Sequence, residues 1–108
     1  MERKGSAKGT KRERAGKSAR PRAKSVSFRL DAPEATAVAI AGDFNSWDPG
    51  AHPLSRSEEG VWQVTVRLSP GIYQYKFLVD GAEWREDASN PNRVPNAYGT
   101  FNSVREVV

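Results

Sequence analysis

The chain has 108 residues, 37% of them hydrophobic and 28% charged, which is enough for one domain and too few for two ordinary ones. It has no Cys and a single His, which excludes disulfides, thiol nucleophiles and zinc sites built from several His or Cys residues. No apolar run approaches the roughly 20 residues of a membrane span and no signal-peptide core is visible, so we expect no membrane span and a cytoplasmic location.

Charge is divided unevenly along the chain. Residues 1–25 contain ten Lys or Arg and two Glu, whereas residues 26–108 contain seven basic and eleven acidic side chains. Every Trp, Tyr and Phe follows position 25. A segment as polar as residues 1–25 cannot bury enough apolar surface to offset the entropy lost on ordering. We therefore predict a disordered basic tail at residues 1–25 and a folded domain at residues 26–108.

Within the expected domain, apolar and polar residues alternate with the period of two that is typical of half-buried β-strands. The strands predicted from this alternation are, in chain order, residues 26–30, 38–40, 62–68, 73–79 and 82–85, with a less regular closing strand within 101–108. Asp80-Gly81, between two of these runs, is a strong signal for a tight hairpin. The pattern predicts an all-β antiparallel sandwich of six to seven or more short strands.

Residues 85–100 break this alternation with Asn90-Pro91, Val94-Pro95 and Gly99, and they contain few apolar side chains that could pack in a core. A polar loop of this length in so small a domain is more often functional than idle.

Sequence signs of catalysis are weak. No nucleophile elbow, phosphate-binding loop or dinucleotide-binding Gly motif is present. His52 stands next to Pro53 in an expected loop, and we expect it to face solvent because no motif supplies the orienting partner of a general base. We therefore expect a protein that is not an enzyme.

The three Trp residues fall into two groups. Trp62 is in phase with Val64 and Val66, which favours packing in the core. Trp47 and Trp84 lie outside that phase, in or beside turns. In such a position an indole either covers an open end of the sandwich or binds a ligand. The residues alone support these two interpretations equally.

A sugar is the ligand that suits such indoles best. The C–H face of a pyranose ring matches an indole in size, and stacking combines burial of area with weak C–H···π attraction. Lys76 can donate hydrogen bonds to sugar hydroxyls, and Asn102 can both donate and accept them. Nucleic-acid bases also stack on aromatics, but the acidic domain suits phosphates poorly.

Three parts of the chain together resemble a known family. Gly42-Asp43-Phe44-Asn45-Ser46-Trp47, then Gly71-Ile72-Tyr73-Gln74-Tyr75-Lys76-Phe77-Leu78-Val79-Asp80-Gly81, then Trp84, Asp87 and Pro91 closely resemble the family-48 carbohydrate-binding module. This immunoglobulin-like "early set" sandwich occurs in the glycogen-binding domain of the AMP-activated protein kinase β subunit and in glycogen branching and debranching enzymes. The resemblance covers about residues 26–108.

The resemblance implies a binding site for α-1,4-linked glucan, such as glycogen, starch or maltooligosaccharides. It implies that Trp47 and Trp84 stack on glucose units, and that Lys76 and Asn102 hydrogen-bond sugar hydroxyls with Thr100 alongside. Tyr98 replaces the aliphatic residue of the kinase-type domain, and it either extends the stacking surface or blocks the glucan. The resemblance implies neither cofactor nor metal.

The local motif also holds residues with a structural role. We expect Phe44 to anchor the loop in the core, Asn45 to bond the backbone, and Gly42 and Gly71 to be required by their φ angles or by turns.

Two other functions remain open. Early-set sandwiches also serve as protein-interaction or regulatory modules, for which a glycogen-metabolising enzyme or a kinase is the candidate partner. The basic tail at residues 1–25 is the one part suited to nucleic acid or another polyanion, although such Lys/Arg runs are common and unspecific.

Overall fold

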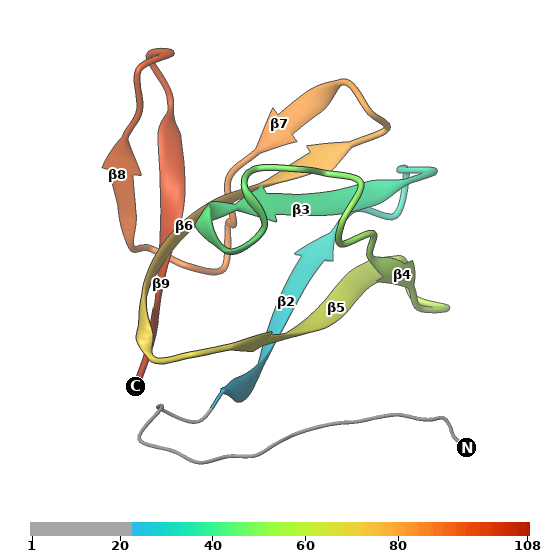
Figure 1. Cartoon of the computed structure of the whole chain (residues 1–108). Helices are drawn as coiled ribbons and strands as arrows, with labels where there is room; N and C mark the ends of the chain where they lie inside the picture. Colours follow the sequence, from blue (N-terminus) through green and yellow to red (C-terminus); the bar gives the residue numbers. More distant parts are fainter. Residues whose placement is uncertain (1–22) are drawn as a thin grey trace, which may run out of the picture.

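The computed structural model describes residues 23–108 (Figure 1). The first strand, β2, begins at Lys24 and so includes two residues that we assigned to the tail. The disorder and the nucleic-acid role predicted for the rest of the tail, residues 1–22, lie outside the described residues. Within the described part, no helix is long and apolar enough to cross a membrane.

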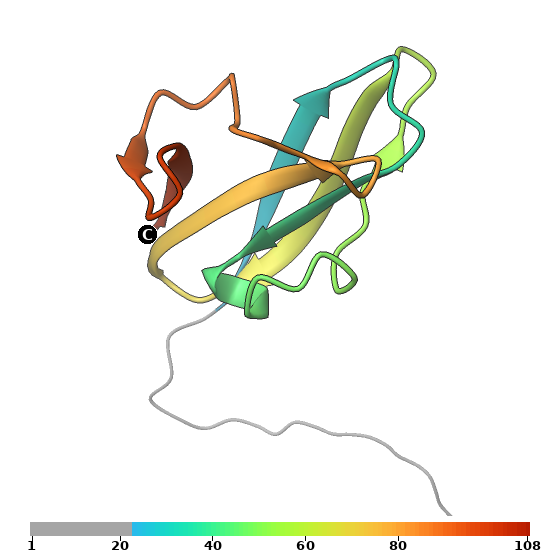
Figure 2. The same cartoon turned by 90° about the horizontal axis from the view of Figure 1, so that it is seen from above.

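Two antiparallel sheets form a sandwich, and Figure 2 shows one crossing over the other. The first sheet has the order β2-β5-β4, with β2 at Lys24–Asp31, β4 at Ser55–Arg56 and β5 at Val61–Leu68. The second has the order β3-β6-β9-β8, with β7 also paired to β6. Its strands are β3 (Val38–Gly42), β6 (Gly71–Val79), β7 (Glu83–Arg85), β8 (Arg93–Pro95) and β9 (Phe101–Val107). The all-β, immunoglobulin-like sandwich predicted above is confirmed.

Strand β6 is the centre of the second sheet. Residues 75–79 of β6 pair with β3 on one edge. On the other edge, residues 71–75 pair with β9 and residues 77–79 pair with β7. Every strand of this sheet except β8 is therefore hydrogen-bonded directly to β6.

The inward side chains of the two sheets meet in one aromatic core. Phe28 of β2 packs against Tyr75 of β6 with ring centroids 4.8 Å apart, and against Phe44 with centroids 5.6 Å apart. Trp62 of β5 is 6% exposed, and its indole N–H donates to the carbonyl of Ala32 at 2.9 Å. A buried indole with a satisfied N–H confirms the core position predicted for Trp62.

Two strands and one turn of helix were not predicted. Strand β8 lies inside the segment expected to be a loop, and β4 has two residues. Neither is long enough to show a period of two. Pro95 is compatible with β8 because β8 is an edge strand, where a missing N–H leaves no bond unmade. The segment Asp43–Asn45 forms a 3-10 turn, η3.

The hairpin predicted at Asp80-Gly81 is confirmed. Both residues have positive φ, 55° and 67°, and the N–H of Ala82 bonds the carbonyl of Val79 at 3.0 Å. The Asp80 carboxylate also accepts bonds from Thr36 N, Thr36 Oγ1 and Ala37 N at 2.7–2.9 Å. These bonds, that from the Thr36 N–H above all, hold the pKa of Asp80 below its ordinary value of 3.8.

We predict that Trp62→Ala destabilises the fold by about 3–5 kcal/mol, because it truncates a large core side chain. The measurement is urea unfolding of the full chain. The matched control is Trp84→Ala, which removes an indole that is 46% exposed and should leave the unfolding midpoint almost unchanged. An unchanged midpoint for Trp62→Ala would contradict the core assignment.

We predict that Asp80→Asn lowers the melting temperature near pH 6 more than near pH 2.5. A carboxyl group whose pKa is lower in the folded state than in the unfolded state stabilises the folded state. This stabilisation is complete at a pH above the unfolded pKa and is lost as the pH falls through the folded pKa. Asn accepts positive φ as Asp does, so the turn itself is preserved. Thermal melts of both proteins across this pH range are the measurement, and an equal difference at both ends would show that the carboxylate charge contributes nothing.

Candidate functional site

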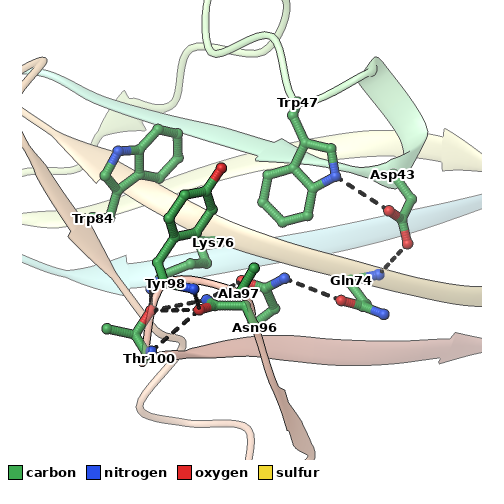
Figure 3. Close-up of a pocket in the computed structure, with 10 residues that line it drawn as sticks. Asp43, Trp47, Gln74, Lys76, Trp84, Asn96, Ala97, Tyr98 and Thr100 are labelled. Carbon is green, nitrogen blue, oxygen red and sulfur yellow. Dashed lines mark hydrogen bonds between the residues drawn. The ribbon is translucent and has the colours of Figure 1, made fainter.

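A cavity of about 840 Å³ lies on the outer face of the second sheet (Figure 3). Strands β6, β7 and β9 and the loops after β3 and β8 all contribute to it. The lining residues are Asp43, Trp47, Gln74, Lys76, Trp84, Asn96, Ala97, Tyr98, Thr100 and Asn102. The structure thus brings all six predicted site residues to one cavity.

The floor of the cavity follows from the alternation of β6. Tyr75 and Phe77 point into the core and are fully buried, so Gln74 and Lys76 point to the other face. The Lys76 ammonium donates to Thr100 Oγ1 at 3.1 Å, and the residue is 7% exposed. Asn102 of β9 donates from Nδ2 to Gln74 Oε1 at 3.0 Å. The floor therefore consists of polar side chains that are hydrogen-bonded in two pairs.

Trp47 is held at the cavity by the turn that follows β3. Ser46 and Trp47 both have left-handed backbones, with φ of 57° and 59°, and the N–H of Trp47 bonds the carbonyl of Gly42 at 2.9 Å. The indole N–H donates to Asp43 Oδ1 at 3.2 Å, while Asp43 Oδ2 accepts the backbone N–H of Gln74 at 2.8 Å. Asp43 therefore joins the indole to β6.

Asn45 secures the base of this turn. Its Oδ1 accepts the N–H of Gly42 at 3.0 Å, and its Nδ2 donates to the carbonyl of Ile40 at 3.1 Å. Nδ2 also lies 2.9 Å from Nδ1 of His52, whose ring packs edge-on to Phe44. The expectation that His52 faces solvent is wrong, because this bond and this contact keep it partly buried.

Neither Gly42 nor Gly71 has the positive φ that would require glycine. A Cβ on Gly42 would lie 2.4 Å from the carbonyl oxygen of Gln74 and 2.8 Å from Cβ of Tyr75. Gly42 is therefore required by close approach to β6, and its φ of −170° is ordinary extended backbone. A Cβ on Gly71 would make ordinary contacts with Tyr73.

Trp84 reaches the cavity from β7. It pairs with Leu78 of β6 and lies on the same face of the sheet as Lys76. Its side chain is 46% exposed, and Figure 3 shows the indole on the far side of the Tyr98 ring from Trp47. The two indoles thus come from opposite edges of β6.

The third group of residues comes from the loop between β8 and β9. Asn96 Oδ1 accepts the N–H groups of Tyr98 and Thr100 at 2.9 and 3.1 Å, and Asn96 Nδ2 donates to Asn102 Oδ1 at 3.0 Å. Sequence reasoning did not single out Asn96, Asp43 or Gln74 as site residues. A local signal for Asn96 was present in the sequence. An Asn three residues before a Gly, here Gly99, is typical of a turn in which the Asn side chain bonds the backbone.

A buried network anchors the base of this long loop. The hydroxyl of Tyr75 donates to Asp87 Oδ2 at 2.7 Å, and the N–H of Asp87 donates to Ser103 Oγ at 2.8 Å. Asn90 Nδ2 donates to the Tyr75 oxygen at 3.1 Å and to the carbonyl of Val104 at 2.8 Å. Burial raises the pKa of Tyr75 above its ordinary range, so the hydroxyl remains a donor.

The arrangement combines flat aromatic faces with amide, hydroxyl and ammonium groups, and its charged lining residues are Asp43 and Lys76. Within residues 23–108, no three His, Cys, Asp or Glu side chains lie close enough to hold a metal ion. Fold and cavity together define a β-sandwich with a cavity of aromatic and polar side chains on the outer face of one sheet.

Comparison with known proteins identifies the family. Residues 14–95 match carbohydrate-binding module 48, the isoamylase N-terminal domain. The chain is 40% identical over 81 residues to the 1,4-alpha-glucan branching enzyme GlgB of Deinococcus radiodurans, covering 74% of this chain and 11% of that enzyme. It is 35% identical over 93 residues to the GlgB enzyme of Salinibacter ruber, covering 83% of this chain and 15% of that enzyme.

The chain belongs to carbohydrate-binding module family 48. It spans roughly a tenth of the length of the curated relatives it matches first, which are complete branching enzymes.

Proposed function

We propose that this domain binds α-1,4-linked glucan, such as glycogen, starch or maltooligosaccharides, without hydrolysing it. The observation that carries the proposal is a single cavity that joins the indoles of Trp47 and Trp84 to the donors of Lys76, Thr100 and Asn102. Membership of a carbohydrate-binding family and relatives named for action on 1,4-alpha-glucan support the choice of sugar.

Each part of the cavity suits one part of a glucose unit. The indole faces of Trp47 and Trp84 cover the C–H faces of sugar rings by stacking. Lys76 offers an ammonium donor, and the amide of Asn102 offers both donors and an acceptor, as vicinal hydroxyls require. Because the ligand is uncharged and each stacked unit contributes modestly, we expect a micromolar to millimolar dissociation constant, about −4 to −8 kcal/mol.

We predict that Trp47→Ala and Trp84→Ala each largely abolish co-sedimentation of the full chain with glycogen while the domain stays folded. Each change removes a stacking face worth about 1–3 kcal/mol, judged from base stacking on aromatic side chains, which is decisive for a weak ligand. Competition with β-cyclodextrin tests whether the bound polymer occupies the same site.

The matched control for these variants is Ile72→Ala, an exposed apolar side chain of β6 outside this cavity, which should bind as the parent does. Binding at the parent level by either Trp variant would assign that indole a purely structural role. Absence of binding by the parent would leave the alternative of a protein-interaction module.

We predict that Lys76→Met weakens binding of maltoheptaose by about 1.5–3 kcal/mol, the range for a hydrogen bond to a charged group. Met retains most of the buried stem, so packing against the sheet is kept. Titration calorimetry with Arg29→Met as control separates the lost donor from lost positive charge, because Arg29 is an exposed residue of β2 in the other sheet.

A further inference from the structure

His52 lies beside the turn that presents Trp47, and it is the single His of the chain. Imidazole is the side chain that ordinarily gains or loses a proton between pH 5 and 8. The backbone carbonyl of His52 accepts the N–H of Ile40 in β3 at 3.1 Å, and its ring meets that of Phe44 edge-on with centroids 5.8 Å apart. The partly buried ring is therefore held between β3 and the turn η3.

The bonds of Asn45 determine which form of this ring the turn accepts. Asn45 Oδ1 faces a donor, the N–H of Gly42, and Asn45 Nδ2 faces an acceptor, the carbonyl of Ile40, so the amide has a single orientation. The second N–H of Nδ2 is then left for Nδ1 of His52, 2.9 Å away. Nδ1 must accept this bond, which requires a neutral imidazole with its proton on Nε2.

A proton on Nδ1 of His52 would set two donors face to face. A charged imidazole carries an N–H on both ring nitrogens and has no acceptor. Asn45 cannot turn its amide to offer the oxygen without losing both of its backbone bonds. Protonation therefore separates the ring from Asn45 or displaces the turn.

Asn45 and Trp47 belong to the same short turn. The N–H of Trp47 bonds the carbonyl of Gly42, the residue whose own N–H is held by Asn45. Ser46 and Trp47 have left-handed φ of 57° and 59°, a conformation that residues other than Gly keep only where the surrounding structure fixes it. A displacement of Asn45 therefore moves the indole at the edge of the cavity.

The charged groups near this ring already have other partners. Asp43 of η3 uses one carboxylate oxygen on the Trp47 indole and the other on the N–H of Gln74. Asp48 accepts a backbone N–H of its own loop, and β3 has no charged residue. Within residues 23–108, no carboxylate forms an ion pair with His52. A positive charge on His52 thus gains no partner to offset the lost bond.

We propose that neutral His52 is a positioning residue for Trp47, and that protonation of its ring loosens the turn and weakens glucan binding. The inference rests on the proposed glucan binding and adds a regulation of that site by pH. Glucan has no titratable group, and carboxyl groups ordinarily titrate below pH 5. A change of affinity between about pH 8 and pH 5.5 therefore reports on the imidazole.

The first test measures maltoheptaose binding of the full chain by titration calorimetry at about pH 8 and pH 5.5. The parent should bind about three- to tenfold more weakly at the lower pH, the size of one lost hydrogen bond. His52→Asn keeps an acceptor as many bonds from the backbone as Nδ1 and cannot be protonated in this range. It should bind at both pH values as the parent does at pH 8.

His52→Phe is the matched variant that lacks the acceptor. It keeps a ring beside Phe44 but offers no lone pair to Asn45, so it should bind weakly at both pH values. Thermal melts at both pH values check that each variant is folded.

A magnetic resonance titration of the parent tests the link to Trp47 without changing His52. The ring signals of the single His are identified directly, and the Trp47 indole N–H signal is assigned from Trp47→Phe. This signal should shift with the same midpoint as the His52 ring. The Trp84 signal should not follow, because β7 pairs with the other edge of β6, whereas a general loss of structure in acid would move both indoles.

Three results overturn the inference: equal affinity of the parent at both pH values, the same pH dependence in His52→Asn, or a Trp47 signal that does not follow the His52 titration. In each case binding by the parent at pH 8, and its loss in Trp47→Ala, would leave the proposed function intact. No binding of maltoheptaose by the parent at either pH would overturn the proposed function together with this inference.

Discussion

The alternation of side chains along β6 is the constraint on which both the core and the site depend. Tyr75 and Phe77 point inward and are fully buried, while Gln74 and Lys76, from the same strand, form the floor of the cavity. A slip of one residue in register would exchange the two faces. Burial of the aromatic core therefore fixes which side chains the cavity receives, and the stability of the fold and the geometry of the site cannot be adjusted independently at these positions.

The neighbours of β6 extend this constraint to the rest of the site. Strand β7, which carries Trp84, and strand β9, which carries Asn102, pair with the same edge of β6. Strand β3 pairs with the opposite edge and leads into the turn that presents Trp47. Asp43 adds a direct bond from that turn to the β6 backbone. Each of these side chains is therefore one hydrogen-bonded strand or one short turn away from β6.

The site and core residues that the sequence predicted depend on local patterns, whereas those that it missed depend on contacts between residues far apart in the chain. A period of two is local, so it predicted the longer strands and the buried Trp62. It also left Trp47 and Trp84 out of phase with the core, and the motif resemblance then implied that they contact sugar. The contribution of Asp43 depends on a bond to a backbone group 31 residues away. No local pattern reveals such a contact, and strands of two or three residues are too short to show a period.

The polar residues of the cavity already bond to one another in the free domain. Lys76 donates to Thr100, Asn102 donates to Gln74, and Asn96 donates to Asn102. In the proposed glucan complex, a sugar hydroxyl would share or replace these bonds and give up its own bonds to water, so the net gain from each polar contact is smaller than the strength of the bond itself. Stacking on the exposed parts of the rings replaces no such bond; Trp84 is 46% exposed and Tyr98 is 89% exposed. For the proposed glucan binding, we therefore expect the aromatic rings to add affinity without breaking bonds inside the cavity, and the preformed polar floor to select the orientation of the sugar ring.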